Sequence, residues 1–199
     1  MSEYLYYDCL NISEEWFKLG KGKDSEQSSD VVFKFIAYWI AFNGIFSKFS
    51  NGIDTERHQI EELLNSKKFD SLIGLIDFDK APECEVFREA PVFQCDRNPH
   101  SGVDYLLHNI MRDEYKSCKN QIDNYRNFNQ STDERKRWLA LLLTIKQVRN
   151  NLFHGQKTPS PDRNYELVNS SQKILEQVLF KLLGELTNDT EEKDFKQCI

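Results

Sequence analysis

The chain has 199 residues, of which 39% are hydrophobic and 29% are charged, and its formal net charge at pH 7 is −6. This composition is typical of a folded domain with a sizeable core and excludes a disordered chain. The acidic balance argues against broad, non-specific nucleic-acid binding. The opening MSEYLYYDCLNISEEW lacks the basic and apolar stretches of a secretory signal, so the five cysteines are interpreted as reduced thiols of a cytoplasmic protein.

The first strongly periodic segment, SSDVVFKFIAYWIAFNGIFSKFSNG, predicts a helix over residues 31–49 with Ser29 or Asp30 as its N-cap. This helix is apolar on almost every side, so a membrane span is one interpretation. The polar residues Lys34 and Asn43 inside the run favour the other interpretation, a central helix buried in a soluble domain.

Two shorter helices follow. DTERHQIEELLNSKKF predicts an amphipathic helix with Ile60, Leu63 and Leu64 on its inner side, and SLIGLIDF predicts another short helix. Residues 79–102 then contain three prolines and no sustained period, which predicts a loop excursion or lid.

Four potential metal ligands lie in or near that excursion: Cys84, Cys95, His100 and His108. Their spacing matches no usual zinc pattern, so buried thiols and surface histidines are the stronger interpretation. We therefore expect no metal site.

The second half is again helical. VDYLLHNIMRDEYKSC predicts a helix, and NQIDNYRNFNQS is the polar segment in which it ends. TDERKRWLALLLTIKQVRNNLFHG predicts the next long helix. Ser160 and Pro161 are the expected N-cap and first position of a last helix that runs to about Leu186, with residues 188–199 as a flexible tail. Since no segment has a strand period, residues 1–199 are predicted to form one all-α domain.

The long helix ending at NNLFHG carries two apolar stripes. One is an ordinary core seam, formed by Trp138, Leu141, Ile145, Val148 and Leu152.

The second stripe lies opposite the seam and contains Leu139, Leu143, Asn150 and His154, with Arg149 on the border. Something should cover the two leucines, either another part of the domain or a second copy of the chain. A two-fold homodimer is the favoured interpretation, because it would bring two copies of this helix end together. His154 lies at the negative end of this helix, so the pKa of its imidazole is expected near neutrality.

Charge is concentrated in the same region. Residues 134–163 contain seven basic and two acidic residues, a local excess of +5. Such an excess could hold a polyanion at one place, although charge alone favours a solvated helix face.

The segment RNNLFH, residues 149–154, matches the R-N-x-x-x-H form of the R-x4–6-H motif of the HEPN domain superfamily. RNNLFHGQK, with DRNYEL after it and YWIAFNGIF on an earlier helix, resembles the Apea-like HEPN group of prokaryotic defence and stress proteins. The resemblance covers roughly residues 31–186 in architecture, but in motif only residues 149–157 and, loosely, 38–46. It implies a bundle of long antiparallel helices with a Pro-rich inserted loop.

The resemblance implies a metal-independent endoribonuclease without a cofactor, in which the ribose 2′-OH attacks the adjacent phosphate. The expected catalytic residues are His154 as proton acceptor and donor, Arg149 as the cation that holds the phosphate, and Asn150 as an orienting amide. Each also has a structural interpretation: Arg149 could pair with a carboxylate, Asn150 could bond a buried carbonyl, and His154 could cap the helix.

Further contacts are expected around this triplet. Lys157, Arg163 and Lys146 are candidate RNA-phosphate ligands. Asn43 could support Arg149 through a hydrogen bond, or be a lone buried amide bonded to backbone.

RNA, a second copy of the chain and an antitoxin or other regulatory protein are the implied partners, and no membrane is expected. Gln156 stands where some HEPN toxins carry a tyrosine that a partner nucleotidyltransferase modifies, which puts that regulation in doubt. Since other HEPN proteins have lost activity, the alternative is a non-catalytic module that binds a nucleotide, RNA or protein.

Overall fold

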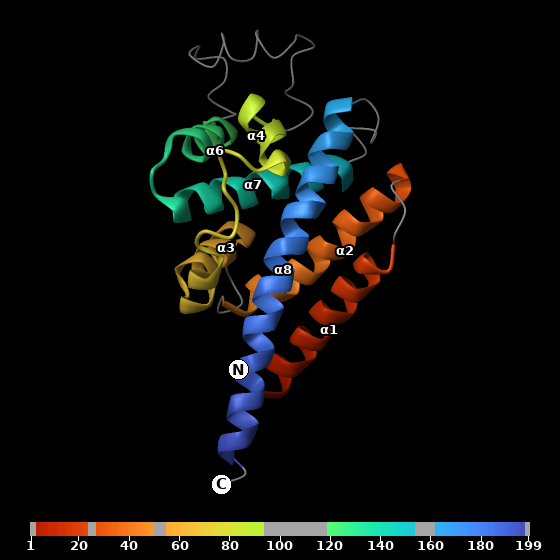
Figure 1. The fold of residues 1–199 in the computed structure, drawn as a ribbon, viewed down its shortest axis with the longest axis vertical. Coiled ribbons are helices and arrows are strands. Elements are labelled where there is room, and N and C mark those ends of the chain that lie inside the picture. The colour runs from red at the N-terminus through yellow and green to blue at the C-terminus, as the bar shows by residue number, and fades with distance from the viewer. Residues whose placement is uncertain (1–2, 24–26, 50–54, 94–118, 154–161, 198–199) are drawn as a thin grey trace. The chain divides into compact units, whose positions relative to one another are not determined.

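The computed structural model describes residues 3–23, 27–49, 55–93, 119–153 and 162–197. Every regular element in these residues is a helix, which confirms the all-α class (Figure 1). The chain divides into two compact units, and the single domain stays a prediction. The first unit contains Met1–Ile76 and Gln172–Ile199, and the second contains Asp77–Ser171.

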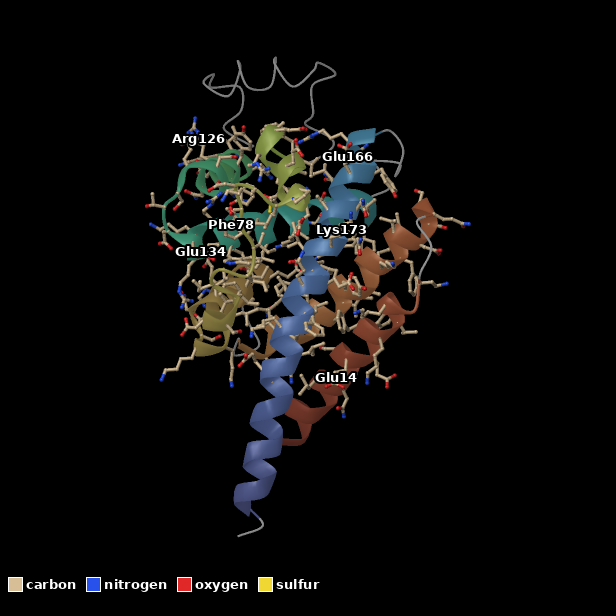
Figure 2. All side chains as sticks on the ribbon, viewed as in Figure 1. Glu14, Phe78, Arg126, Glu134, Glu166 and Lys173 are labelled. Atoms are coloured by element: carbon tan, nitrogen blue, oxygen red, sulfur yellow. The ribbon has the colours of Figure 1, made fainter. Side chains whose placement is uncertain are left out.

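The first unit begins with a helix that the sequence analysis did not predict, α1 (Glu3–Lys21), which packs along α2 (Ser28–Phe46). The two helices approach closely at Gly20, where an added Cβ would lie 2.3 Å from Cε1 of Tyr38. The Tyr38 ring is fully buried and its centroid lies 5.5 Å from that of Phe17. Figure 2 shows the side chains of this unit, with Glu14 labelled on α1.

Helix α2 begins at Ser28, earlier than predicted, because the extended Gln27 is its N-cap. It ends at Phe46, and a 3₁₀ turn, η1 (Ser47–Phe49), follows directly. By length and hydropathy α2 could cross a membrane, but half of its apolar window is buried inside the protein. Its aromatic rings contribute to the core: the centroids of Trp39 and Phe46 lie 6.1 Å apart.

Helix α3 (Glu56–Asn65) has the predicted inner face, since Ile60, Leu63 and Leu64 are all buried. The hydroxyl of Thr55 caps it by accepting from the backbone N–H of His58. The predicted SLIGLIDF helix is wrong in position, because the helical segment is the 3₁₀ element η2 (Lys67–Leu72). The extended Ile73 ends this element, and Gly74 follows in a left-handed conformation with a φ of 78°.

The second unit begins at Asp77, two residues before the predicted loop excursion of residues 79–102. That segment is partly helical, containing the 3₁₀ turn η3 (Pro82–Cys84) and the short helix α4 (Glu85–Glu89). Buried Val86 and Phe87 anchor α4. Residues 94–118 lie outside the described residues, and with them the helix predicted over residues 103–118.

The segment NQIDNYRNFNQS was predicted to be the polar end of a preceding helix. It is itself a helix, α6 (Lys119–Gln130), anchored by buried Ile122 and Phe128. Helix α7 (Glu134–Phe153) confirms the predicted long helix. The Phe78 ring joins these helices, with centroids 5.7 Å from that of Phe128 and 5.0 Å from that of Trp138.

The last helix, α8 (Asp162–Gln197), continues beyond the predicted end near Leu186, so residues 188–197 are helical where a flexible tail was predicted. Its residues 162–171 belong to the second unit and the remainder to the first. The predicted cap at Ser160 and Pro161 lies outside the described residues.

Candidate functional site at the end of helix α7

Helix α7 holds the candidate motif in place through its predicted seam. Trp138, Leu141, Ile145 and Val148 are buried, and Leu152 is half-buried. At its other end the carboxylate of Asp133, just before the helix, accepts from the backbone N–H groups of residues 135 and 136. The register of α7 is therefore fixed by a cap at its start and by apolar contacts along its length.

Arg149 lies one turn before the end of α7 and is half-buried. The centre of its guanidinium lies 5.9 Å from the centroid of the Phe153 ring, which is 58% exposed. Arg149 therefore places a positive charge beside an exposed aromatic ring near the end of α7, with its Nε buried.

The two asparagines of the motif have different environments. Asn150, the predicted catalytic amide, is half-buried. Asn151 is buried, donates from Nδ2 to the carbonyl oxygen of Phe93 at 2.9 Å, and accepts from Nε2 of Gln147 at 2.9 Å. Asn151 therefore ties the motif to the segment after α4. The sequence analysis assigned Asn151 no role, and its helical position gave no signal of this distant contact.

Arg163, a candidate RNA-phosphate ligand, makes contacts within the second unit. Its Nη2 donates to the carbonyl oxygen of Ala90 at 2.8 Å, while its buried Nε has no hydrogen-bond partner among the residues that the structure describes. Burial lowers the pKa of this guanidinium, and the nearby carboxylates of Glu89 and Glu166 act in the opposite direction. Arg163 thus joins the first turn of α8 to the α4 segment.

The other predicted site residues are placed as follows. Lys146 is half-buried on α7, whereas His154 and Lys157 lie outside the described residues. Asn43 is exposed on α2, so its predicted burial is wrong. The reason is that α2 has a less buried side, which Asn43 shares with Phe33 and Ile40.

The second apolar stripe of α7 is covered in part within the chain. Leu143 is only 7% exposed and Leu139 is half-buried, while the neighbouring Leu142 is fully buried. The protein's own chain covers Leu143, whereas Leu139 stays partly exposed, and the homodimer stays a prediction.

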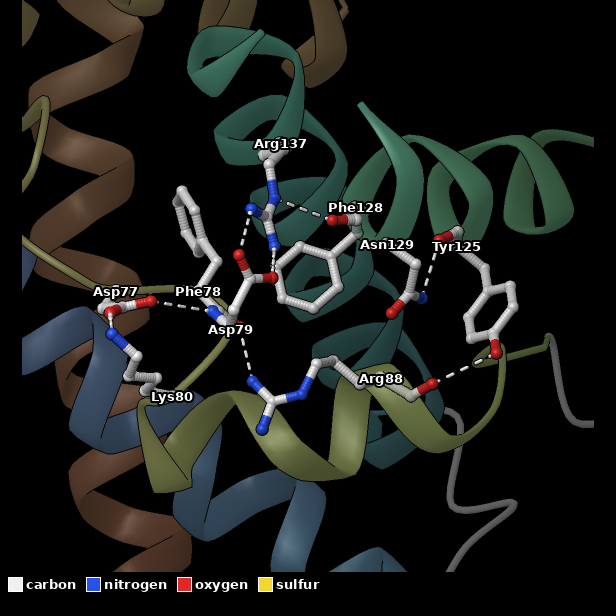
Figure 3. A network of polar contacts seen from close by, with 9 residues as sticks. All are labelled: Asp77, Phe78, Asp79, Lys80, Arg88, Tyr125, Phe128, Asn129 and Arg137. Atoms are coloured by element: carbon white, nitrogen blue, oxygen red, sulfur yellow. Dashed lines mark hydrogen bonds and ion pairs between the residues drawn. The ribbon is translucent and has the colours of Figure 1, made fainter. Parts of the chain in front are cut away.

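Part of the predicted basic excess is neutralised within the second unit (Figure 3). The Arg137 guanidinium makes two contacts with the Asp79 carboxylate, at 2.7 and 3.3 Å, and donates from Nε to the carbonyl oxygen of Phe128 at 2.9 Å. It also lies over the rings of Phe78 and Phe128, at 4.9 and 5.7 Å from their centroids. Its side chain is only 13% exposed, so Arg137 is a structural residue.

The same network connects α4 and α6. Arg88 donates to the carbonyl oxygen of Phe78, and the hydroxyl of Tyr125 donates to the carbonyl oxygen of Arg88 at 3.1 Å (Figure 3). Within the described residues, no group of three or more His, Cys, Asp or Glu side chains is placed to hold a metal ion. Cys84 is buried, and burial raises the pKa of its thiol to about 12; Cys95, His100 and His108 lie outside the described residues.

What the described residues offer at the end of α7 is a half-buried cation, an adjacent half-buried amide and an exposed aromatic ring, fixed by a buried asparagine. No family model, curated protein or solved structure matches this chain.

Proposed function

We propose that the protein is an HEPN-type endoribonuclease that cleaves RNA without a metal ion, acting in prokaryotic defence or stress response. The observation that supports this proposal best is the position of the RNNLFH motif, whose Arg149 is half-buried on the final turns of the long helix α7. The motif resembles that of the HEPN superfamily, and an exposed helix end is where a phosphate could reach the guanidinium.

In the proposed reaction, the ribose 2′-OH attacks the adjacent phosphorus and the 5′-oxygen of the next nucleotide leaves. His154 would accept the hydroxyl proton or protonate the leaving oxygen, because an imidazole titrates near neutral pH. Arg149 would stabilise the charge that develops on the phosphate oxygens. Asn150 would orient the phosphate or the imidazole. The product ends would be a 2′,3′-cyclic phosphate and a 5′-hydroxyl.

The alternative is a non-catalytic helical module that binds a nucleotide, RNA or protein through the same helix end. The contacts of Arg137 and Arg163 favour keeping this alternative, because both guanidiniums are bonded to the protein itself and add little to an RNA-binding surface.

Incubation of the purified protein with mixed RNA in EDTA separates the two functions. We expect fragments that end in 2′,3′-cyclic phosphate, and we expect His154→Ala and Arg149→Ala to abolish most cleavage. Lys136→Ala is the matched control for loss of a positive charge, since Lys136 is 66% exposed near the start of the same helix. Intact RNA that the wild-type protein nevertheless binds would support the non-catalytic module. Cleavage by His154→Ala at the wild-type rate would overturn the assignment of the histidine.

A further inference from the structure

Phe153 is an exposed aromatic residue on a helix that otherwise covers its apolar side chains. It is 58% exposed, whereas every other apolar residue of α7 is buried or half-buried. Asn151 lies two residues earlier, which places it about 200° away around the helix axis. Since Asn151 is buried and bonded to the Phe93 carbonyl, the Phe153 ring lies on the side of the helix that faces solvent.

The Phe153 ring shares its side of α7 with positive charge and with an amide. Lys146, Arg149 and Asn150 precede this residue by seven, four and three positions, the spacings of one helix face. All three side chains are half-buried, and the Arg149 guanidinium lies 5.9 Å from the ring centroid. Residues 135–161 contain no acidic residue, so this stretch itself supplies no carboxylate to neutralise the two cations.

A nucleobase with its phosphates is the ligand that uses all of these groups. The flat face of a base stacks on an aromatic ring, while cations beside the ring attract the phosphates that flank the base. An apolar peptide could also cover the ring, but it would make no use of the cations and the amide. The ring is also held in place before a ligand binds, because Asn151 and half-buried Leu152 anchor the last turn of α7.

We infer that Phe153 is the base-stacking residue of the proposed nuclease site. Its ring binds the flat face of a nucleobase next to the phosphate at Arg149. It favours a purine there, because a purine has the larger surface for stacking. The inference rests on the proposed function for the identity of the ligand as RNA, and it adds to the predicted catalytic triplet a residue that selects the base.

Binding of short oligonucleotides to the full chain in EDTA tests the stacking contact without cleavage. The probes are 2′-fluoro oligoadenylate and 2′-fluoro oligouridylate, which lack the 2′-OH that the proposed reaction needs. Phe153→Ala should raise the Kd of the adenylate probe about tenfold and that of the uridylate probe less. Phe153→Leu keeps an apolar side chain without a π face and should lose binding in the same way, whereas Phe153→Trp should retain it.

Phe180→Ala is the matched control, because Phe180 is 69% exposed and lies on α8 in the first unit. A wild-type Kd for the adenylate probe in Phe153→Ala, or an equal rise in Phe180→Ala, would overturn the inference, as would a wild-type protein that binds neither probe. If Phe153→Ala keeps both Kd values but dissociates an oligomer in sedimentation velocity, the ring contacts protein and the inference is wrong.

Steady-state cleavage of RNA separates this inference from the proposed function. Phe153→Ala should raise KM about tenfold and leave kcat within about twofold, whereas Arg149→Ala should lower kcat. Cleavage by Phe153→Ala with a wild-type KM would overturn the inference and leave the proposed function intact. A wild-type protein that cuts no RNA, yet binds the probes through Phe153, would support the inference for the non-catalytic module and overturn the endoribonuclease.

Discussion

Replacing Asn151 by alanine should destabilise the protein by about 2–3 kcal/mol, although the residue lies within the proposed catalytic motif. The change leaves the carbonyl oxygen of buried Phe93 without its donor, which costs about 1–3 kcal/mol. The Gln147 amide also loses its acceptor, but it is half-buried and water can replace part of that bond. In a protein of this size, the loss should lower Tm by about 4–12 °C.

Urea unfolding followed by circular dichroism measures this effect, with Asn150→Ala as the matched control. Asn150 is half-buried, so its replacement should change the free energy of unfolding by only about 0.5 kcal/mol. Under the proposed function, Asn150→Ala should instead reduce RNA cleavage. Asn151→Asp should be at least as damaging as Asn151→Ala, because a carboxylate cannot donate to the Phe93 carbonyl. If Asn151→Ala were as stable as Asn150→Ala, the structural role of Asn151 would be refuted.

Three further predictions concern stability and reactivity. Gly20→Ala should lower the free energy of unfolding by about 1–2 kcal/mol in thermal denaturation, because overpacking against the buried Tyr38 ring outweighs the gain in helix propensity; a more stable variant would contradict the close α1–α2 contact. Cys84 should resist alkylation in the folded protein at pH 8 and react in urea, as peptide mass spectrometry can show, because its thiol is buried and has a raised pKa; labelling without denaturant would argue against this. The hydrogen bond and charge of Arg137 lower the pKa of Asp79 below its ordinary value of 3.8, so the pair contributes stability above that value and loses it as the pH falls through the lowered pKa. The difference in urea midpoint between wild type and Asp79→Asn should therefore be present at pH 7 and shrink below about pH 4, and a pH-independent difference would exclude this linkage.

Helical periodicity was sufficient to predict the elements whose own residues specify them. The spacing of Ile60, Leu63 and Leu64 predicted the inner face of α3, and that of Trp138, Leu141 and their neighbours predicted the seam of α7. The helicity of residues 119–130 escaped prediction, because only two buried side chains anchor an otherwise polar segment.

The surroundings of the candidate site could not be predicted in the same way. Asn150 and Asn151 are identical in type and adjacent in sequence, yet only Asn151 meets the Phe93 carbonyl, 58 residues away. Arg137 was counted among the basic residues near the motif, but Asp79, also 58 residues away, neutralises it.

The sequence by itself determined the all-α class, the apolar seam of α7 and the position of the RNNLFH motif at the end of that helix, because these depend on residues a few positions apart. Only the tertiary structure decided which polar groups of that helix end are buried and bonded, and that Leu143 is covered within one chain. The physical reason is that periodicity shows which side of a helix is apolar, whereas the groups that cover that side come from distant parts of the chain.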